Sequence, residues 1–235
     1  MFEPVKIAPS ILSADFMHLG RDIELIEKAG AGYVHVDVMD GHFVPNLTMG
    51  VPVVKQLKKA TSLPLDVHLM IANPLEQLPW FLDAGPASVP VHAEALDADG
   101  LARAVAAIHA AGAKAAVSVK PRTAVGALAP VLADLDMVLV MSVEPGFSGQ
   151  SYIEGSEAKV ARIAEMARAV GASPLIQVDG GIGEVTAPIV AAAGADVLVC
   201  GNAVFAAEDP AAALAAVQAA AEEARLAALA VSKEA

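Results

Sequence analysis

The segment YVHVDVMD (residues 33–40) alternates apolar and polar side chains, as a buried strand with one chemically active face would. Side chains of an extended chain point alternately to its two sides. The segment therefore divides into two faces: Val34, Val36 and Val38 on one, and His35, Asp37 and Met39 on the other. We interpret the valine face as part of the core and the opposite face as part of a site.

Seven further short, β-rich runs recur along the chain, with helical patterns between them. Several of the helical patterns end in the triplet "AGA", at Gly30, Gly112 and Gly194, which is typical of a helix that closes on a left-handed glycine. Together with the first segment, the strand-like runs cover residues 6–12, 33–40, 64–70, 87–93, 114–120, 137–143, 174–180 and 196–202.

This alternation predicts parallel strands joined by right-handed helical crossovers. Eight such units in 235 residues favour an α/β fold of the closed (β/α)8 TIM-barrel type, with an open doubly wound sheet as the alternative. We expect residues 1–235 to form one barrel domain, because no linker or low-complexity region divides the chain. The Ala-rich stretch that begins at Pro210 is predicted to be the last helix, with a frayed end after about residue 225.

The composition excludes several classes of function. A net charge of −12 disfavours nucleic acid and anionic membranes as partners, because both require clustered Lys and Arg. Mean hydropathy is positive, but no uncharged apolar run reaches the length of about 18 residues that a membrane span needs. The N-terminal stretch MFEPVKIAPS lacks the pattern of a secretion signal, so we expect a cytoplasmic protein. The single cysteine, Cys200, cannot form an intrachain disulfide.

Unexpected polar residues fall near the carboxyl ends of the predicted strands, where TIM barrels carry their active sites. They are Ser10, His35, Asp37, His68 and Asp179. Two imidazoles and two carboxylates that converge at one rim predict a site for a single divalent ion, and this donor set suits Zn²⁺, Fe²⁺, Mn²⁺ or Co²⁺.

Glycine-rich segments follow the sixth, seventh and eighth predicted strands. They are GFSGQ (146–150), DGGIG (179–183) and CGN (200–202). Glycines allow backbone N–H groups to approach an anion closely, and barrels often bind phosphate in this region. An acidic chain without a lysine cluster is therefore predicted to bind a phosphorylated small molecule here.

These motifs closely resemble those of the ribulose-phosphate 3-epimerase family. The resemblance covers about residues 5–206 and rests on SILSADF (10–16), HVDVMDGHFVPN (35–46), LDVHLM (65–70), MSVEPGFSGQ (141–150) and VDGGI (178–182). It implies a TIM barrel of the ribulose-phosphate-binding type, an isomerase that takes a phosphorylated ketose, and a homo-oligomer.

The resemblance also implies roles for individual residues. Asp37 and Asp179 would be the catalytic acid/base pair, and both would bind the metal together with His35 and His68. The substrate contacts that it implies are Ser10, His68, Met39, Met70, Met141, Gly146, Phe147, Ser148, Gly149, Gly180, Gly181, Gly201 and Asn202. Two of these depart from the family pattern: Ser148 replaces a glycine and Asn202 replaces a serine.

The implied reaction interconverts D-ribulose 5-phosphate and D-xylulose 5-phosphate. Inversion at C3 requires proton removal on one face and delivery on the other, which two carboxylates can perform, while a metal stabilises the enediolate between the two steps. Of the other polar residues, His92 and Glu94 are interpreted as supporting the site from behind, His42 as shaping it, and Lys120 as packing at the rim.

Three alternatives stay open at this point. A six-carbon ketose phosphate such as allulose 6-phosphate would undergo the same chemistry at C3. A decarboxylase or aldolase on a related barrel would usually carry Asp-x-Lys-x-x-Asp in the third strand, but LDVHLM (65–70) has no lysine. A non-catalytic sugar-phosphate sensor would need the phosphate loops but not both aspartates.

Overall fold

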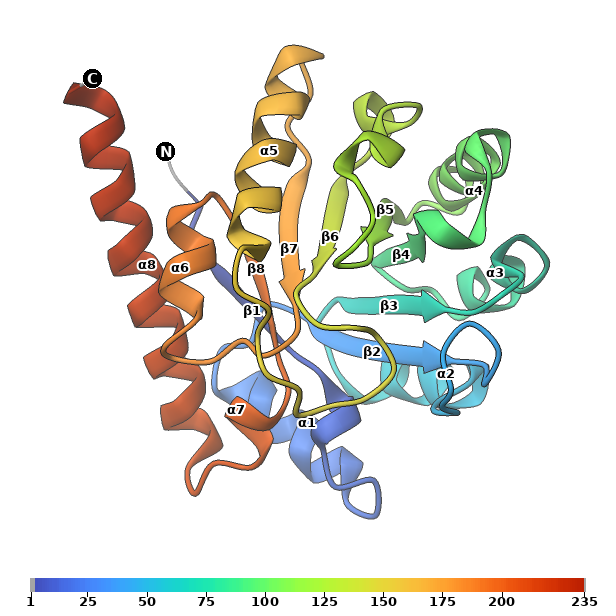
Figure 1. Ribbon diagram of the computed structural model, residues 1–235. Coiled ribbons are helices and arrows are strands. Elements are labelled where there is room, and N and C mark those ends of the chain that lie inside the picture. Colours follow the sequence, from blue (N-terminus) through green and yellow to red (C-terminus); the bar gives the residue numbers. More distant parts are fainter. Residues whose placement is uncertain (1–2, 235) are drawn as a thin grey trace.

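Eight parallel strands form one curved sheet in the computed structural model, which describes residues 3–234 (Figure 1). The sheet order is β1-β8-β7-β6-β5-β4-β3-β2, and an isolated parallel bridge between Ser10 and His35 joins its two ends. The prediction of a TIM barrel is thereby confirmed over an open doubly wound sheet. The strands are β1 (Lys6–Pro9), β2 (Val34–Met39), β3 (Leu65–Met70), β4 (Ser88–His92), β5 (Lys114–Val119), β6 (Met137–Met141), β7 (Leu175–Asp179) and β8 (Val197–Cys200).

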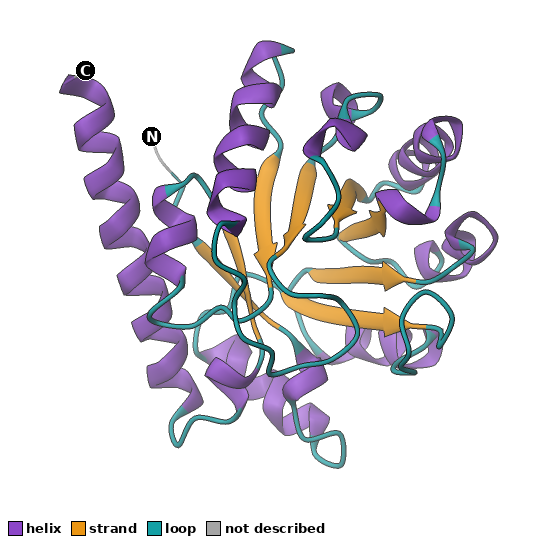
Figure 2. Ribbon diagram, viewed as in Figure 1, coloured by secondary structure: helices purple, strands orange, loops and turns teal. Residues whose placement is uncertain are grey.

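Helices surround the strands (Figure 2). Within residues 3–234 none of them is both long and apolar enough to cross a membrane. The α-helices are α1 (Leu19–Lys28), α2 (Val51–Ala60), α3 (Pro74–Leu82), α4 (Ala98–Ala110), α5 (Ser156–Ala169), α6 (Ala187–Ala192), α7 (Asn202–Phe205) and α8 (Pro210–Glu234).

Helix α4 shows how the local sequence sets the ends of these elements. The Asp97 side chain caps its N-terminus by accepting a 2.7 Å hydrogen bond from the Gly100 N–H. Leu101 and Ile108 lie on the buried face, and the chain leaves the helix through Gly112 with φ of 77°. The predicted left-handed helix-ending glycines are confirmed, because Gly30 and Gly194 also have positive φ.

The connection between β5 and β6 contains two short 3-10 segments, Val125–Leu128 and Leu132–Asp134, in place of an α-helix. Pro121 and Pro130 interrupt this stretch, and Gly126 lowers its helix propensity further. The fifth strand–helix unit is therefore present in topology but not as a regular helix.

Strand β2 has the two faces that its alternation predicts. Val34 and Val36 are fully buried in the main apolar core, which also contains Ile23 of α1 and Val54 of α2. The polar face of β2 points into the barrel instead, where His35 is also fully buried. The predicted core face thus packs against helices, and the opposite face is free to build a site.

Candidate active site

Four predicted site residues come together from three strands. Asp37 of β2 is the register partner of His68 of β3, and Asp179 is the last residue of β7. His35 is the second residue of β2, so the prediction that it lies near the end of its strand is wrong. It nevertheless lies level with the carboxyl end of β1, because strands in a barrel are staggered and Ser10, just after β1, bridges to His35.

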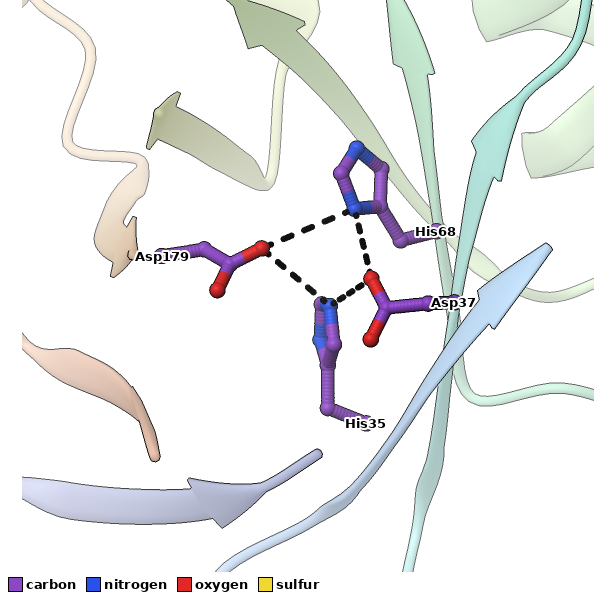
Figure 3. A group of neighbouring side chains, drawn as sticks. All are labelled: His35, Asp37, His68 and Asp179. Carbon is purple, nitrogen blue, oxygen red and sulfur yellow. Dashed lines mark ion pairs between the residues drawn. The ribbon is translucent and has the colours of Figure 1, made fainter. Parts of the chain in front are cut away.

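The four side chains point toward one another (Figure 3). Asp37 Oδ1 lies 3.3 Å from His35 Nε2 and 3.4 Å from His68 Nδ1. Asp179 Oδ2 lies 3.8 Å and 3.9 Å from the same two nitrogens. Each of the four side chains offers one possible ligand atom, and these four atoms all lie within 4.8 Å of one another.

The chemistry of this donor group fits a divalent metal ion. Within residues 3–234, His35 Nε2 and His68 Nδ1 are buried and have no hydrogen-bond partner, although Asp37 Oδ1 is close to both. A buried polar atom without a partner costs free energy unless something satisfies it. The two unpaired imidazole nitrogens and the two carboxylates that they face are together the kind of ligand set that such an ion needs.

The electrostatic environment shifts the pKa values of the two carboxylates in opposite directions. Burial opposes ionisation of Asp37, but His35 and His68 beside it outweigh burial and hold its pKa well below the usual value. Burial and the charge of Asp37 together raise the pKa of Asp179. Two close carboxylates without a cation therefore do not both ionise readily.

Behind the site, a buried hydrogen-bond network orients His35. Asp66 Oδ2 lies 2.8 Å from His35 Nδ1 and accepts a 2.7 Å hydrogen bond from the Gln177 side-chain amide. Asp66 Oδ1 accepts a 2.6 Å hydrogen bond from Ser88. The sequence interpretation missed these three supporting residues. Asp66 and Gln177 each lie two positions before a predicted site residue on the same strand face, and this spacing was the available signal.

A cavity of 360 Å³ opens beside the four-residue group. Asp37 and Asp179 line it, whereas His35 and His68 do not and are fully buried behind them. The predicted role of His68 in substrate contact therefore has no support from the cavity lining. The other predicted contacts that line the cavity are Ser10, Met39, Met70, Met141, Gly146, Phe147, Ser148, Gly149, Gly180, Gly181, Gly201 and Asn202.

Ser10 contacts Asp37 as well as the cavity. Its hydroxyl donates a 2.5 Å hydrogen bond to Asp37 Oδ2, so this oxygen is engaged while Oδ1 faces the imidazoles. Met39 and Met70 form a small apolar cluster with Val44 at the side of the site. One wall of the cavity is therefore apolar and the floor carries the carboxylates.

The glycine loops after β6, β7 and β8 form the opposite part of the cavity. A Cβ on Gly149 would lie 2.6 Å from Asn202 Nδ2, and one on Gly181 would collide with the backbone of Tyr152. Ser148 Oγ lies 2.5 Å from Ser13 Oγ and donates a 3.3 Å hydrogen bond to Asn202 Oδ1. The two residues that depart from the family pattern thus contact each other at this end of the cavity.

The closed parallel barrel, with carboxylates at its carboxyl-end rim and glycine loops after β6 to β8, defines a TIM barrel whose cavity lies where enzymes of this fold carry their active sites. Comparison with known proteins supports a narrower assignment. A model described as "Ribulose-phosphate 3 epimerase family" matches residues 6–205.

Curated relatives agree with this match. The chain is 48% identical over 206 residues to ribulose-phosphate 3-epimerase of Bacillus subtilis, covering 87% of this chain and 94% of the relative. It is 49% identical over 213 residues to the Mycobacterium bovis ribulose-phosphate 3-epimerase, covering 90% and 91%. It is 46% identical over 215 residues to the chloroplastic ribulose-5-phosphate-3-epimerase of Arabidopsis thaliana, covering 92% and 76%. The chain belongs to the ribulose-phosphate 3-epimerase family, and the prediction that it is an isomerase is confirmed.

Solved structures at lower identity support the fold. A 3-hexulose-6-phosphate synthase aligns with a TM-score of 0.61 at 24% identity, covering 93% of this chain and 99% of that one. The structure titled "KGPDC from Streptococcus mutans" aligns with a TM-score of 0.69 at 14% identity, covering 94% and 99%. These two proteins share the barrel architecture with this chain.

Proposed function

We propose that this isomerase interconverts D-ribulose 5-phosphate and D-xylulose 5-phosphate by two-base proton transfer at C3. The observation that carries the proposal is the position of two carboxylates. Asp37 and Asp179 both line the cavity, and both approach the unpaired nitrogens of His35 and His68. An epimerase needs such a pair, because a single base cannot reach both faces of one carbon.

The two carboxylates come from strands that are far apart in the sheet order, β2 and β7. A ketose phosphate between them would present opposite faces of C3 to the two side chains. One carboxylate removes the proton next to the carbonyl, and the other delivers a proton to the opposite face. Ser10 holds Asp37 in place through its hydrogen bond to Oδ2.

The four-residue group would hold one divalent ion, and the nitrogen and oxygen donors suit Zn²⁺, Fe²⁺, Mn²⁺ or Co²⁺. When bound, such an ion supplies Lewis-acid stabilisation for the negative charge that develops on O2 and O3. The hydrogen bond between His35 and Asp66 orients the His35 ring with Nε2 toward the ion.

The rest of the cavity suits the remainder of the substrate. Met39, Met70 and Met141 give an apolar wall that excludes water from the reacting carbons and strengthens local electrostatic interactions. The glycine loops at the other end can bring backbone N–H groups to the phosphate. Together these features support a substrate that carries a phosphate at one end and reacts near the other.

Three further properties of the chain are proposed: its domain extent, its cellular location and its oligomeric state. We propose that all 235 residues belong to one catalytic domain. We also propose a cytoplasmic location and a homo-oligomeric state, the latter because of the family resemblance. Gel filtration with light scattering tests the oligomeric state directly.

The proposed function is tested by steady-state kinetics on matched substrates. Chelated protein is reloaded separately with Zn²⁺, Mn²⁺, Fe²⁺ and Co²⁺, and kcat/KM is measured for D-ribulose 5-phosphate, D-allulose 6-phosphate and unphosphorylated D-ribulose. We expect the five-carbon phosphate to give the highest value and the unphosphorylated sugar the lowest. Higher kcat/KM for the six-carbon phosphate would instead assign the chain to that substrate.

A further inference from the structure

The Nε2 edge of the His68 ring, opposite the Nδ1 that faces Asp37, contacts a second imidazole, that of His92. His68 Nε2 lies 2.9 Å from His92 Nε2, and the two rings are stacked with centroids 5.0 Å apart. His92 Nδ1 in turn lies 2.9 Å from Glu94 Oε2. We propose that His92 and Glu94 are positioning residues that fix the tautomer of His68, so that its Nδ1 is the nitrogen available to the metal. This inference rests on the metal site of the proposed function.

The direction of the hydrogen bonds between Glu94, His92 and His68 is set at Glu94. Its carboxylate accepts hydrogen bonds from two other donors. Its Oε1 accepts a 2.7 Å hydrogen bond from the Lys120 N–H and a further one from the Thr123 hydroxyl. Lys159 Nζ donates to the carbonyl oxygens of Lys120 and Thr123 at 2.8 and 2.6 Å, which holds the turn that supplies these donors. An ionised carboxylate is only an acceptor, so Oε2 must accept a hydrogen bond from the N–H at His92 Nδ1.

The tautomers of both histidines follow from that assignment. A neutral imidazole has one N–H and one lone pair, so His92 with its proton on Nδ1 presents a lone pair at Nε2. The facing Nε2 of His68 must then carry the proton in the 2.9 Å contact. His68 is left with its lone pair on Nδ1, the buried atom without a hydrogen-bond partner among the described residues. The His92 ring is fully buried, which disfavours a charged imidazolium at that position.

The same logic gives the opposite ring orientation at His35. There Nδ1 is the nitrogen that donates, directly to Asp66, and Nε2 is the one left for the metal. The two histidines therefore approach one point through different nitrogens. One is backed directly by a carboxylate, and the other is backed by a neutral imidazole with a carboxylate behind it. Partners of this kind orient metal ligands and tune their basicity.

A loop covers the relay formed by His68, His92 and Glu94. The Phe43 ring packs on His92 with centroids 4.7 Å apart, and the Lys120 ammonium lies 3.8 Å from the centroid of Phe43. The Glu94 side chain keeps 20% of its surface exposed, whereas His92 has none. The relay thus runs from the buried site to a carboxylate near the surface.

The variant Glu94→Gln is a sharp test because an amide has one acceptor and one donor end. Lys120 N–H and the Thr123 hydroxyl require an acceptor, so the amide oxygen should face them and the NH₂ group should face His92. His92 would then carry its proton on Nε2, opposite His68. We expect His68 to move its own proton to Nδ1, which opposes metal binding.

A surface pair offers a matched control. Asp136 Oδ2 lies 2.8 Å from His109 Nε2 and accepts a 2.8 Å hydrogen bond from the Ala115 N–H, so it resembles Glu94 in its partners but lies away from the site. Asp136→Asn should leave the metal site unchanged. A general loss of stability from removing a carboxylate would appear in both variants.

The experiment combines ¹⁵N NMR of the histidine rings with zinc affinity from competition against a chelator. For the wild-type protein we expect protons on Nε2 of His68 and on Nδ1 of His92 and His35. For Glu94→Gln we expect zinc affinity to fall by about 10- to 100-fold and for Asp136→Asn to match the wild type. A His92 proton on Nε2 in the wild type, or unchanged affinity in Glu94→Gln, would overturn the inference. Neither readout uses substrate, so tight zinc binding without epimerisation would count only against the proposed function.

Discussion

Asp37 of β2 is the register partner of His68 of β3, and Oδ1 of Asp37 lies 3.4 Å from Nδ1 of His68. Two residues 31 positions apart in the sequence are thus direct neighbours because their strands pair in parallel. His35 Nε2 completes the arrangement at 3.3 Å from the same oxygen. The site is therefore built mainly from the rigid sheet, and its geometry should survive conservative changes to individual side chains.

Metal removal should lower both activity and stability. Without a cation, the buried Asp37 carboxylate, the partly buried Asp179 carboxylate and two unpaired imidazole nitrogens face one another at unfavourable cost. We expect the chelated protein to lose epimerase activity and to recover it on reloading. An ion at about 100 times its dissociation constant should stabilise the fold by about 2.7 kcal/mol, measured as a rise in Tm.

The histidines provide the control for the metal effect. His68→Asn should remove the rise in Tm on zinc addition, whereas His18→Asn on the exposed surface should preserve it. An equal rise in Tm for both variants would show that zinc binds elsewhere.

Replacing either central carboxylate by an amide should stop epimerisation with little change in volume. We expect Asp37→Asn and Asp179→Asn each to lower kcat by about 100- to 10,000-fold, because each removes one partner in proton transfer. The exposed Asp99→Asn serves as the control. The assay follows conversion of D-ribulose 5-phosphate. Appreciable turnover by both Asp37→Asn and Asp179→Asn would contradict the two-base assignment.

The loop after β6 should govern affinity for the phosphate end of the substrate. Gly149 has φ of +75°, and an added Cβ would lie 2.6 Å from Asn202 Nδ2, so Gly149→Ala should displace the loop. Loss of one hydrogen bond to a charged group costs about 1.5–3 kcal/mol, which corresponds to about a 10- to 150-fold rise in KM.

The matched control for the loop is Gly126→Ala. A Cβ added to Gly126 would have no atom within 4 Å beyond its neighbours in the chain, and the φ of Gly126 is not positive. The KM of the Gly126→Ala variant should equal that of the wild type. If Gly149→Ala also retains the wild-type KM, the loop does not bind the phosphate.

A pH-dependent contribution to stability should arise at Glu27, where α1 meets the end of α2. The Ser62 and Thr61 hydroxyls and the Ser62 N–H donate to its carboxylate and lower its pKa. Because the pKa is lower in the folded state than in the unfolded state, this contribution is present above about pH 4.5 and is lost as the pH falls through the folded value.

Glu27→Gln should therefore have a lower Tm than the wild type at pH 7, and the gap should narrow below pH 4. Glu24→Gln is the control on the same helix, because Glu24 pairs only with Lys28 at the surface among the described contacts. A gap for Glu27→Gln that stays constant across this pH range would contradict the assignment.

The period-two pattern of β2 predicted both fold and site, because one alternation places valines toward the helices and ionisable groups into the barrel. The glycine loops were equally predictable, since each follows a strand directly. The prediction placed His35 near the end of β2, whereas it lies near the start of that strand. It still reaches the site because β1 and β2 are staggered, and this stagger cannot be read from either strand alone.

Supporting contacts were harder to predict because they depend on packing across the barrel. Gln177 donates to Asp66 from 111 positions away in the sequence, and no local pattern joins the two. His92 and Glu94 were expected to support the site, but the direction of their hydrogen bonds depends on Lys120 and Thr123, which a different loop contributes. Tautomers follow from the complete set of donors and acceptors, which only the folded chain provides.

The central claim is that the chain removes and returns the proton at C3 of a five-carbon ketose phosphate. Proton NMR of D-ribulose 5-phosphate in D₂O with the metal-loaded protein tests it most directly. We expect D-xylulose 5-phosphate to appear with deuterium at C3. Retention of the C3 proton with zinc, iron(II), manganese and cobalt each tried would contradict the claim.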